Sequence, residues 1–131
     1  MSISTDRSTF LRRSLQLDGL ASGLCGALLL AAAPTITAHF GIAGTRIPRA
    51  VGAGLLVFAA ALLWNAARAR VSRVEAFFTV ALNAAWVVGS LILVVDGPLT
   101  VIGNVAVAVI AAAVLGFAVL EVMGLRRLRA A

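Results

Sequence analysis

Four long apolar runs, separated by short polar connections, dominate the chain. The runs cover about residues 15–38, 50–67, 74–95 and 101–125. Each is close to the ~20 residues that an α-helix needs to cross ~30 Å of hydrocarbon. Apolar and polar positions do not alternate within the runs, and Ala and Leu are abundant, which indicates helices rather than barrel strands. The pattern therefore predicts four transmembrane helices.

The connections predict how these helices are arranged. They contain residues typical of turns and are short: residues 41–45 followed by Pro48, residues 68–73, and residues 96–98. Links this short make sequential helices antiparallel neighbours. We predict an all-α fold, a four-helix transmembrane bundle with up-down-up-down topology, formed by a single membrane domain over residues 1–131. The Ser- and Thr-rich residues 1–10 are expected to form a short tail.

Composition supports lipid as the solvent of this domain. Hydrophobic residues make up 62% of the chain and the mean hydropathy is +1.07. The helices of a soluble domain show a polar face to water, and these apolar runs have no such face.

The arginines indicate orientation rather than nucleic-acid binding. The chain has 11 basic residues, all arginine, and a net charge of +6. They cluster at the ends of the apolar runs instead of along one face, so no nucleic-acid partner is expected. One predicted side carries Arg7, Arg12, Arg13, Arg68, Arg70, Arg73, Arg126, Arg127 and Arg129; the other carries Arg46 and Arg49. The positive-inside rule therefore predicts cytoplasmic termini. A composition with arginine in place of lysine favours a bacterial inner membrane.

A cleaved signal peptide is an alternative interpretation of the first run. Arg12 and Arg13 precede it as in a twin-arginine signal, and Ala38 could end a cleavage site. Such signals usually export soluble domains, whereas three further apolar runs follow here. We therefore expect the first run to be retained as a helix.

The two halves of the chain resemble each other. The segment "LDGLASGLCGALLL" aligns with "LNAAWVVGSLILVV", which matches Asp18 with Asn83. The segment "GLLVFAAALLW" aligns with "AVLGFAVLEVM", which matches Phe58 with Phe117. This similarity predicts a possible 2+2 repeat of a helical hairpin, with both copies in the same orientation. Chance similarity between low-complexity sequences is the alternative.

Polar side chains share one face on the first and third predicted helices. On the first helix they have the spacing i, i+4 and i+7: Asp18, Ser22 and Cys25. They adjoin a GxxxG motif at Gly19 and Gly23, which favours close helix packing. On the third helix the spacing is 4, 3 and 4: Thr79, Asn83, Trp86 and Ser90. Because lipid offers no hydrogen-bond partner, we expect these faces to meet, with Asn83 bound to the first helix.

Ionisable groups within membrane helices are functional candidates. Together with the polar residues near them, they form one candidate buried polar site: Asp18, Ser22, Asn65, Arg68, Asn83 and Glu121. Their depth is open between two interpretations. Asp18 and Glu121 each lie about one turn from an arginine, which predicts ion pairs at the headgroup level, with Arg68 as the cation for Glu121. In the alternative the site is buried, and a desolvated Asp18 exchanges protons near neutral pH.

Other chemistry has little support. One histidine, His39, and one distant cysteine, Cys25, are too few ligands for a haem or a metal. No nucleophile–base pair, phosphate-binding glycine loop or HExxH motif is present. We expect no cofactor, no metal and no enzymatic activity.

Two segments, "SLQLDGLASG" and "ALNAAW", followed by an acid near the end of the last helix, resemble a group of small bacterial membrane proteins with four helices and no assigned activity. The resemblance spans the four helices and transfers no site residue. The size is similar to that of small multidrug exporters and fluoride channels. The chain lacks the deep first-helix glutamate of the exporters and the Phe- and Thr-rich third helix of the channels.

The sequence favours a non-enzymatic structural or interaction protein in the lipid bilayer, as a subunit, a homo-oligomer or the partner of another membrane protein. The scarcity of mid-membrane polar groups and the small-residue faces support this interpretation. The alternative is a small proton-coupled transporter or channel, in which Asp18, Asn83 and Glu121 line a polar cavity on the cytoplasmic side.

Overall fold

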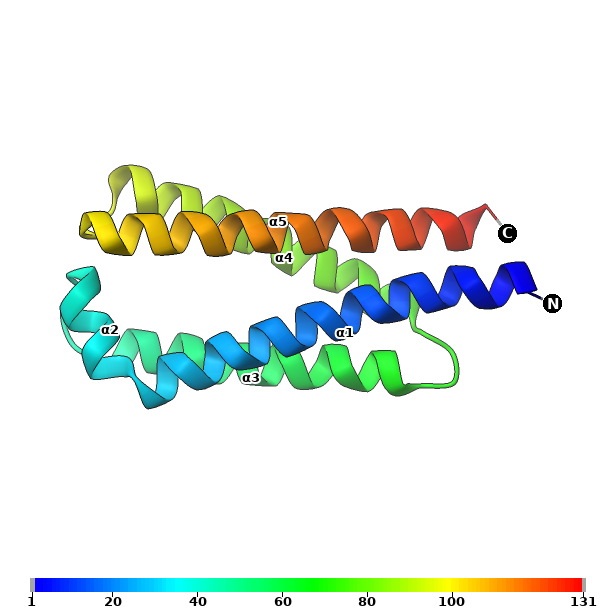
Figure 1. The fold of residues 1–131 in the computed structure, drawn as a ribbon, viewed down its shortest axis with the longest axis horizontal. Coiled ribbons are helices and arrows are strands. Elements are labelled where there is room, and N and C mark those ends of the chain that lie inside the picture. The colour runs from blue at the N-terminus through cyan, green and yellow to red at the C-terminus, as the bar shows by residue number, and fades with distance from the viewer. Residues whose placement is uncertain (1, 131) are drawn as a thin grey trace.

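The computed structural model describes residues 2–130, which form helices and no strand (Figure 1). The helices are α1 (Ser2–Ala31), α2 (Ala33–Phe40), α3 (Arg46–Ala67), α4 (Arg73–Asp96) and α5 (Val101–Arg129). All except α2 are long and apolar enough to cross a membrane. The predicted helical bundle is confirmed, and its composition is that of a multi-pass membrane protein.

The four long helices run antiparallel to their neighbours in sequence. Both termini lie at one end of the bundle, together with the α3–α4 loop, and we call this the terminal end (Figure 1). The short helix α2, the α2–α3 loop and the α4–α5 turn lie at the opposite end, which we call the far end.

The first helix differs from its prediction at both ends. It begins at Ser2, so the expected tail continues the helix, although Met1 lies outside the described residues. The first apolar run is also not one helix, because α1 ends at Ala31 and α2 begins at Ala33. Pro34 explains the break, since proline has no backbone N–H and its ring clashes with the preceding helical turn.

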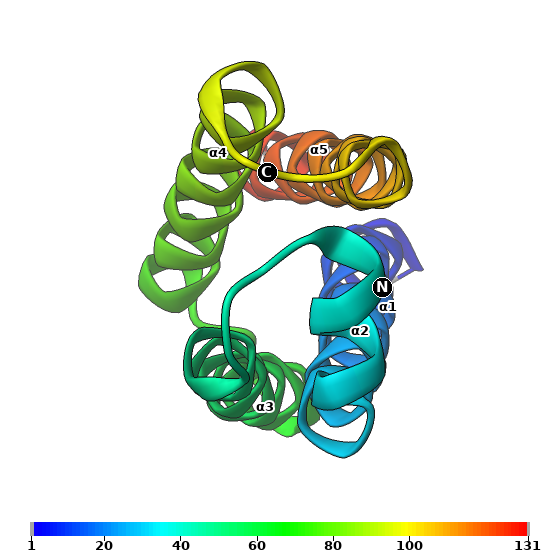
Figure 2. The same cartoon turned by 90° about the vertical axis from the view of Figure 1, so that its left-hand side faces the viewer.

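The helices pair as two hairpins. α1 packs along α3 and α4 packs along α5, and α1 also packs against α5. α3 and α4 make little contact and diverge toward the far end (Figure 2). This pairing agrees with the hairpins of the predicted repeat, while the duplication itself stays a prediction.

Glycines allow the closest approaches between helices. A Cβ placed on Gly26 of α1 would lie 2.7 Å from the carbonyl oxygen of Gly52 on α3, and the reverse distance is 2.8 Å. At the terminal end, a Cβ on Gly124 of α5 would lie 3.0 Å from the Leu11 Cβ. Membrane helices rely on such contacts because lipid supplies no hydrophobic drive for their association.

An apolar core closes the terminal end of the bundle. Its buried members are Leu11, Leu15, Leu62, Ala66 and Ala76. We call this group the apolar seal. Most other large apolar side chains are exposed, including Leu17 and Val57, which are 55% and 72% exposed. Such an outer surface suits hydrocarbon rather than water.

Thr100 joins the two sides of the far end. Its hydroxyl accepts from the Gly103 N–H at the start of α5 (3.1 Å) and donates to the His39 carbonyl at the end of α2 (2.6 Å). Its backbone N–H donates to the Phe40 carbonyl at 3.1 Å. The residue therefore caps one helix and bonds the last turn of another.

Replacing Thr100 with valine should lower the free energy of unfolding by about 1–2 kcal/mol, because the cap and the bond to α2 both need the hydroxyl. Unfolding in mixed micelles, followed by circular dichroism, measures the change. Thr100→Ser keeps the hydroxyl and should stay near wild type. Equal losses in the two variants would contradict this role.

Candidate functional site

Polar side chains from three helices meet inside the bundle. The Asn83 Nδ2 on α4 donates to Asp18 Oδ2 on α1 at 2.7 Å and to Glu121 Oε2 on α5 at 3.2 Å. The Ser22 hydroxyl donates to Asp18 Oδ1 at 3.0 Å. Asp18 and Glu121 are 0% exposed and Asn83 is 3% exposed. We call these four residues the carboxyl cluster.

Local sequence explains how the cluster is positioned. Asp18 and Ser22 lie one turn apart and therefore share a face of α1. Glu121 lies about one turn before Gly124, where the backbone of α5 packs tightly against Leu11 of α1. This close contact turns the Glu121 side chain toward α1 and α4, so the predicted bond between Asn83 and the first helix also includes α5.

The cluster holds two carboxyl groups and no cation among the described residues. The amide of Asn83 has two N–H groups, and the two carboxyl groups use both. Because both carboxyl groups accept from one nitrogen, they lie within about 6 Å of each other, where like charges repel strongly. Glu121 Oε1 is buried without a hydrogen-bond partner among the described residues. Two ionised carboxylates here would be costly in an apolar surrounding.

The predicted ion pairs at the headgroup level are wrong. The apolar seal, with Leu11 and Leu15 on α1, separates the cluster from the terminal end. The expected cation, Arg68, is exposed and binds Glu75 instead, with 2.7 Å between Nη1 and Oε1. Glu121 therefore bonds to an amide in the interior rather than to an arginine at the surface.

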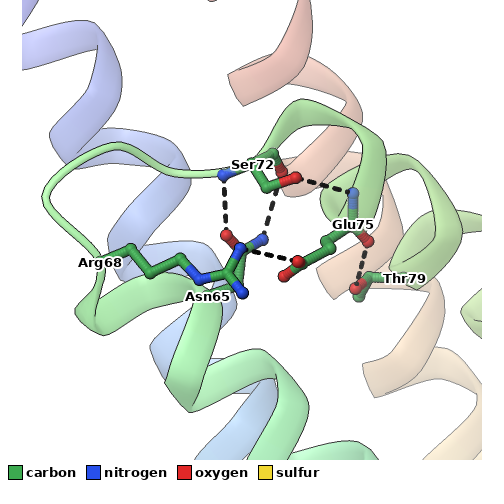
Figure 3. Close-up of polar contacts among 5 residues, drawn as sticks. All are labelled: Asn65, Arg68, Ser72, Glu75 and Thr79. Atoms are coloured by element: carbon green, nitrogen blue, oxygen red, sulfur yellow. Dashed lines mark hydrogen bonds and ion pairs between the residues drawn. The ribbon is translucent and has the colours of Figure 1, made fainter.

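Asn65 in the last turn of α3 and Arg68 directly after it bind the α3–α4 loop and the start of α4, not the cluster (Figure 3). The Asn65 amide donates to the Ser72 carbonyl at 3.2 Å, and its Oδ1 accepts from the Ser72 N–H at 2.7 Å. The Ser72 hydroxyl accepts from the Glu75 N–H and caps α4. Arg12 also donates to the carbonyl oxygens of Ala66 and Arg68. These hydrogen bonds fix the conformation of the α3–α4 loop, so the role of Asn65 and Arg68 is structural.

A largely apolar cavity of about 550 Å³ adjoins the carboxyl cluster. Asp18, Ser22 and Asn83 form its polar wall. From there the cavity extends toward the far end, where Ile36 and Phe40 of α2 line it. The sequence interpretation expected a cavity on the side of the termini. The apolar seal occupies that side, so the space lies in the opposite half of the bundle.

The cavity is exposed at the side of the bundle, because several of its lining residues are exposed, including Leu28 on α1 and Ile110 on α5. Gly54 of α3 and Leu82 of α4 both line it, and both are exposed. Nothing lies within 4 Å of a Cβ placed on Gly54. α3 and α4 also contact each other little and diverge toward the far end (Figure 2), so the exposed lining residues on these two helices lie at the side of the bundle. In a bilayer this side of the bundle borders hydrocarbon.

Aromatic side chains form much of the remaining wall: Phe40, Phe58, Trp86 and Phe117. The sequence alignment of the two halves had matched Phe58 with Phe117, which was a signal for this wall, although it assigned them no role. Trp86 lies one turn from Asn83, and its Nε1 is buried without a hydrogen-bond partner among the described residues. The cavity itself had no signature in the sequence, because it depends on how far α3 and α4 diverge.

No group of three or more His, Cys, Asp or Glu side chains within residues 7–130 is placed to hold a metal ion. Comparison with models of protein families, with curated proteins and with solved structures gave no match for this chain. The resemblance to small bacterial four-helix proteins therefore stays a prediction. The function is argued from the carboxyl cluster and the cavity.

Proposed function

We propose that this protein is a proton-coupled carrier that binds small apolar molecules in the lateral cavity. The observation that carries the proposal is the Asp18–Asn83–Glu121 arrangement, in which Asp18 and Asn83 line that cavity and Glu121 bonds to Asn83 next to it. A purely structural bundle gains little from two adjacent carboxyl groups, whereas a carrier needs an exchangeable proton beside its ligand.

The two carboxyl groups are suited to sharing one proton. Two carboxyl groups in close contact without a cation do not readily ionise together, because their negative charges repel each other in an apolar surrounding. Asp18 accepts one hydrogen bond on each of its oxygens, while Glu121 Oε1 has no hydrogen-bond partner in the described part of the chain. Glu121 is therefore the better proton carrier of the pair.

The closed terminal end supports coupling between proton and ligand. Because the apolar seal lies between the cluster and the terminal end, a proton in this conformation leaves by way of the cavity. A ligand enters the same cavity, so the two species share one route and influence each other's binding. Transport requires a second conformation in which the seal opens and the cavity closes.

The setting proposed for this activity is a bacterial inner membrane with cytoplasmic termini. The excess of arginine at the terminal end supports this orientation under the positive-inside rule. The cavity then opens in the outer half of the membrane.

Pyranine-filled proteoliposomes test the carrier, with the membrane potential clamped by K⁺ and valinomycin. Three probes of similar shape are added outside: tetraphenylphosphonium, triphenylphosphine oxide and tetraphenylborate. Wild-type protein should change the internal pH with at least one probe. Asp18→Asn should abolish the change, because the pair no longer exists.

The matched control is Ser90→Ala, which removes another buried polar group of α4 and should leave the response intact. No internal pH change with any of the three probes would overturn the proposed carrier and favour the structural role.

A further inference from the structure

We infer that the cavity binds a lipophilic cation, meaning a molecule with one delocalised or ammonium positive charge on an aromatic or aliphatic body. This inference rests on the proposed function and names its substrate class. Three features carry it: the charge of the cluster, the apolar walls and the lateral opening.

The charge of the cluster selects against anions. Asp18 is the single charged residue among those that line the described cavity, and Glu121 lies directly behind it across Asn83. When the pair releases its shared proton it carries two negative charges with no cation beside it. A cationic ligand restores the balance, whereas an anionic ligand of the same size adds repulsion.

The walls select for an apolar body. Apart from the polar wall, the lining consists of aliphatic and aromatic side chains, together with Cys25 and Gly54. The volume of about 550 Å³ lies within the range of cavities that bind drug-sized molecules. Phe58, Trp86 and Phe117 also offer ring faces, and a cation close to such a face gains a further attraction.

The opening selects for entry from lipid. The cavity is closed toward the terminal end by the apolar seal, and at the far end Phe40 lines it and is bonded to Thr100. The exposed positions Gly54 and Leu82 border the side opening. A lipophilic cation partitions into the membrane and reaches this opening directly, unlike a strongly hydrated ion.

The exchange conserves charge at the site. In the resting state the pair holds one proton and has a net charge of −1. When the cation binds, the O–H bond of the protonated carboxyl group breaks and the proton passes through the cavity to bulk water. The site then holds two carboxylates and one cation, again with a net charge of −1. One proton is therefore released for each cation that binds.

Calorimetric titration of the protein in nanodiscs with tetraphenylphosphonium measures this release, using buffers of different ionisation enthalpy. We expect about one proton released per cation and binding that tightens about tenfold for each unit of pH. Glu121→Gln leaves one carboxylate and no shared proton. This variant should still bind the cation, but without proton release and without the pH dependence.

Cys25 provides a second readout on the unmodified protein. It is the only cysteine of the chain and lines the cavity one turn from Ser22. Tetraphenylphosphonium should slow the labelling of Cys25 by N-ethylmaleimide at least fivefold. Tetraphenylborate has the same shape and the opposite charge, and at equal concentration it should leave the rate unchanged.

The outcomes separate the two proposals. Equal protection of Cys25 by both ions, or binding of the cation without proton release, overturns the cation inference. If another probe then moves protons in the proteoliposomes, the carrier proposal stands and its substrate class changes. The two ions are compared on wild-type protein, so the test does not depend on whether Glu121→Gln folds.

Discussion

Replacing Asn83 with leucine should destabilise the folded protein by about 3 kcal/mol, because one amide satisfies two buried carboxyl groups. Leucine has a similar size and preserves the packing of α4, so the loss reports on hydrogen bonds rather than on a cavity. The bonded oxygens of Asp18 and Glu121 would remain inside the bundle without their donor. Unfolding by sodium dodecyl sulfate in mixed micelles, followed by circular dichroism, measures the change.

Two controls identify the cause of this loss. Ser90→Ala changes another buried polar position on the same face of α4 and should shift the unfolding free energy by less than about 1 kcal/mol. The double variant Asn83→Leu with Glu121→Leu removes one orphaned carboxyl group together with the amide and should recover much of the loss, as replacement of buried polar groups by apolar ones often does. A double variant as unstable as the sum of its single variants would argue against coupling through the amide.

Gly52→Leu should be the most disruptive substitution outside the carboxyl cluster, with a loss of about 3 kcal/mol or more. A Cβ at this position would lie 2.8 Å from the carbonyl oxygen of Gly26, which is backbone and cannot rotate away. α1 and α3 would have to move apart to accommodate the new side chain. The close packing between them, which stabilises helix association in a membrane, would be lost. The same unfolding assay measures the effect.

Gly89→Ala is the matched control for this prediction. Nothing lies within 4 Å of a Cβ at Gly89, so the added methyl group meets no neighbour. Because alanine favours the helix more than glycine, we expect a neutral result or a gain of up to about 1 kcal/mol. Equal losses at Gly52 and Gly89 would show that glycine matters for the helix itself and not for the contact.

The carboxyl cluster and the cavity contribute differently to the proposed function. The carboxyl cluster alone explains why the pair would retain a proton in the interior of the bundle rather than ionise twice. The cavity brings an apolar ligand to the same place, since Asp18, Ser22 and Asn83 belong to both. The combination supports the proposed carrier, because a charged ligand in the cavity would change the charge that the carboxyl pair can bear.

The candidate residues show how far sequence patterns reach in a membrane protein. Asp18, Ser22 and Asn83 were predicted to meet, because lipid offers no partner to polar side chains and each stripe has a helical period. Asn65 and Arg68 share the same helical face pattern, but they lie at the end of α3, where the loop backbone at Ser72 and the side chain of Glu75 bind them. Because Asn65 and Arg68 lie at a helix end, loop residues close in sequence can bind them. The helical period of polar residues does not reveal whether such loop partners exist.

The sequence by itself determined the number of helices long enough to cross a membrane and their antiparallel order, because the thickness of the hydrocarbon layer and the obligatory pairing of backbone groups leave few alternatives. It also determined that Asn83 turns inward. Only the tertiary structure decided that Glu121 shares the Asn83 amide with Asp18, and that the space beside them is exposed at the side of the bundle. These features depend on how each helix is rotated and tilted, which the backbone contacts at Gly26, Gly52 and Gly124 set.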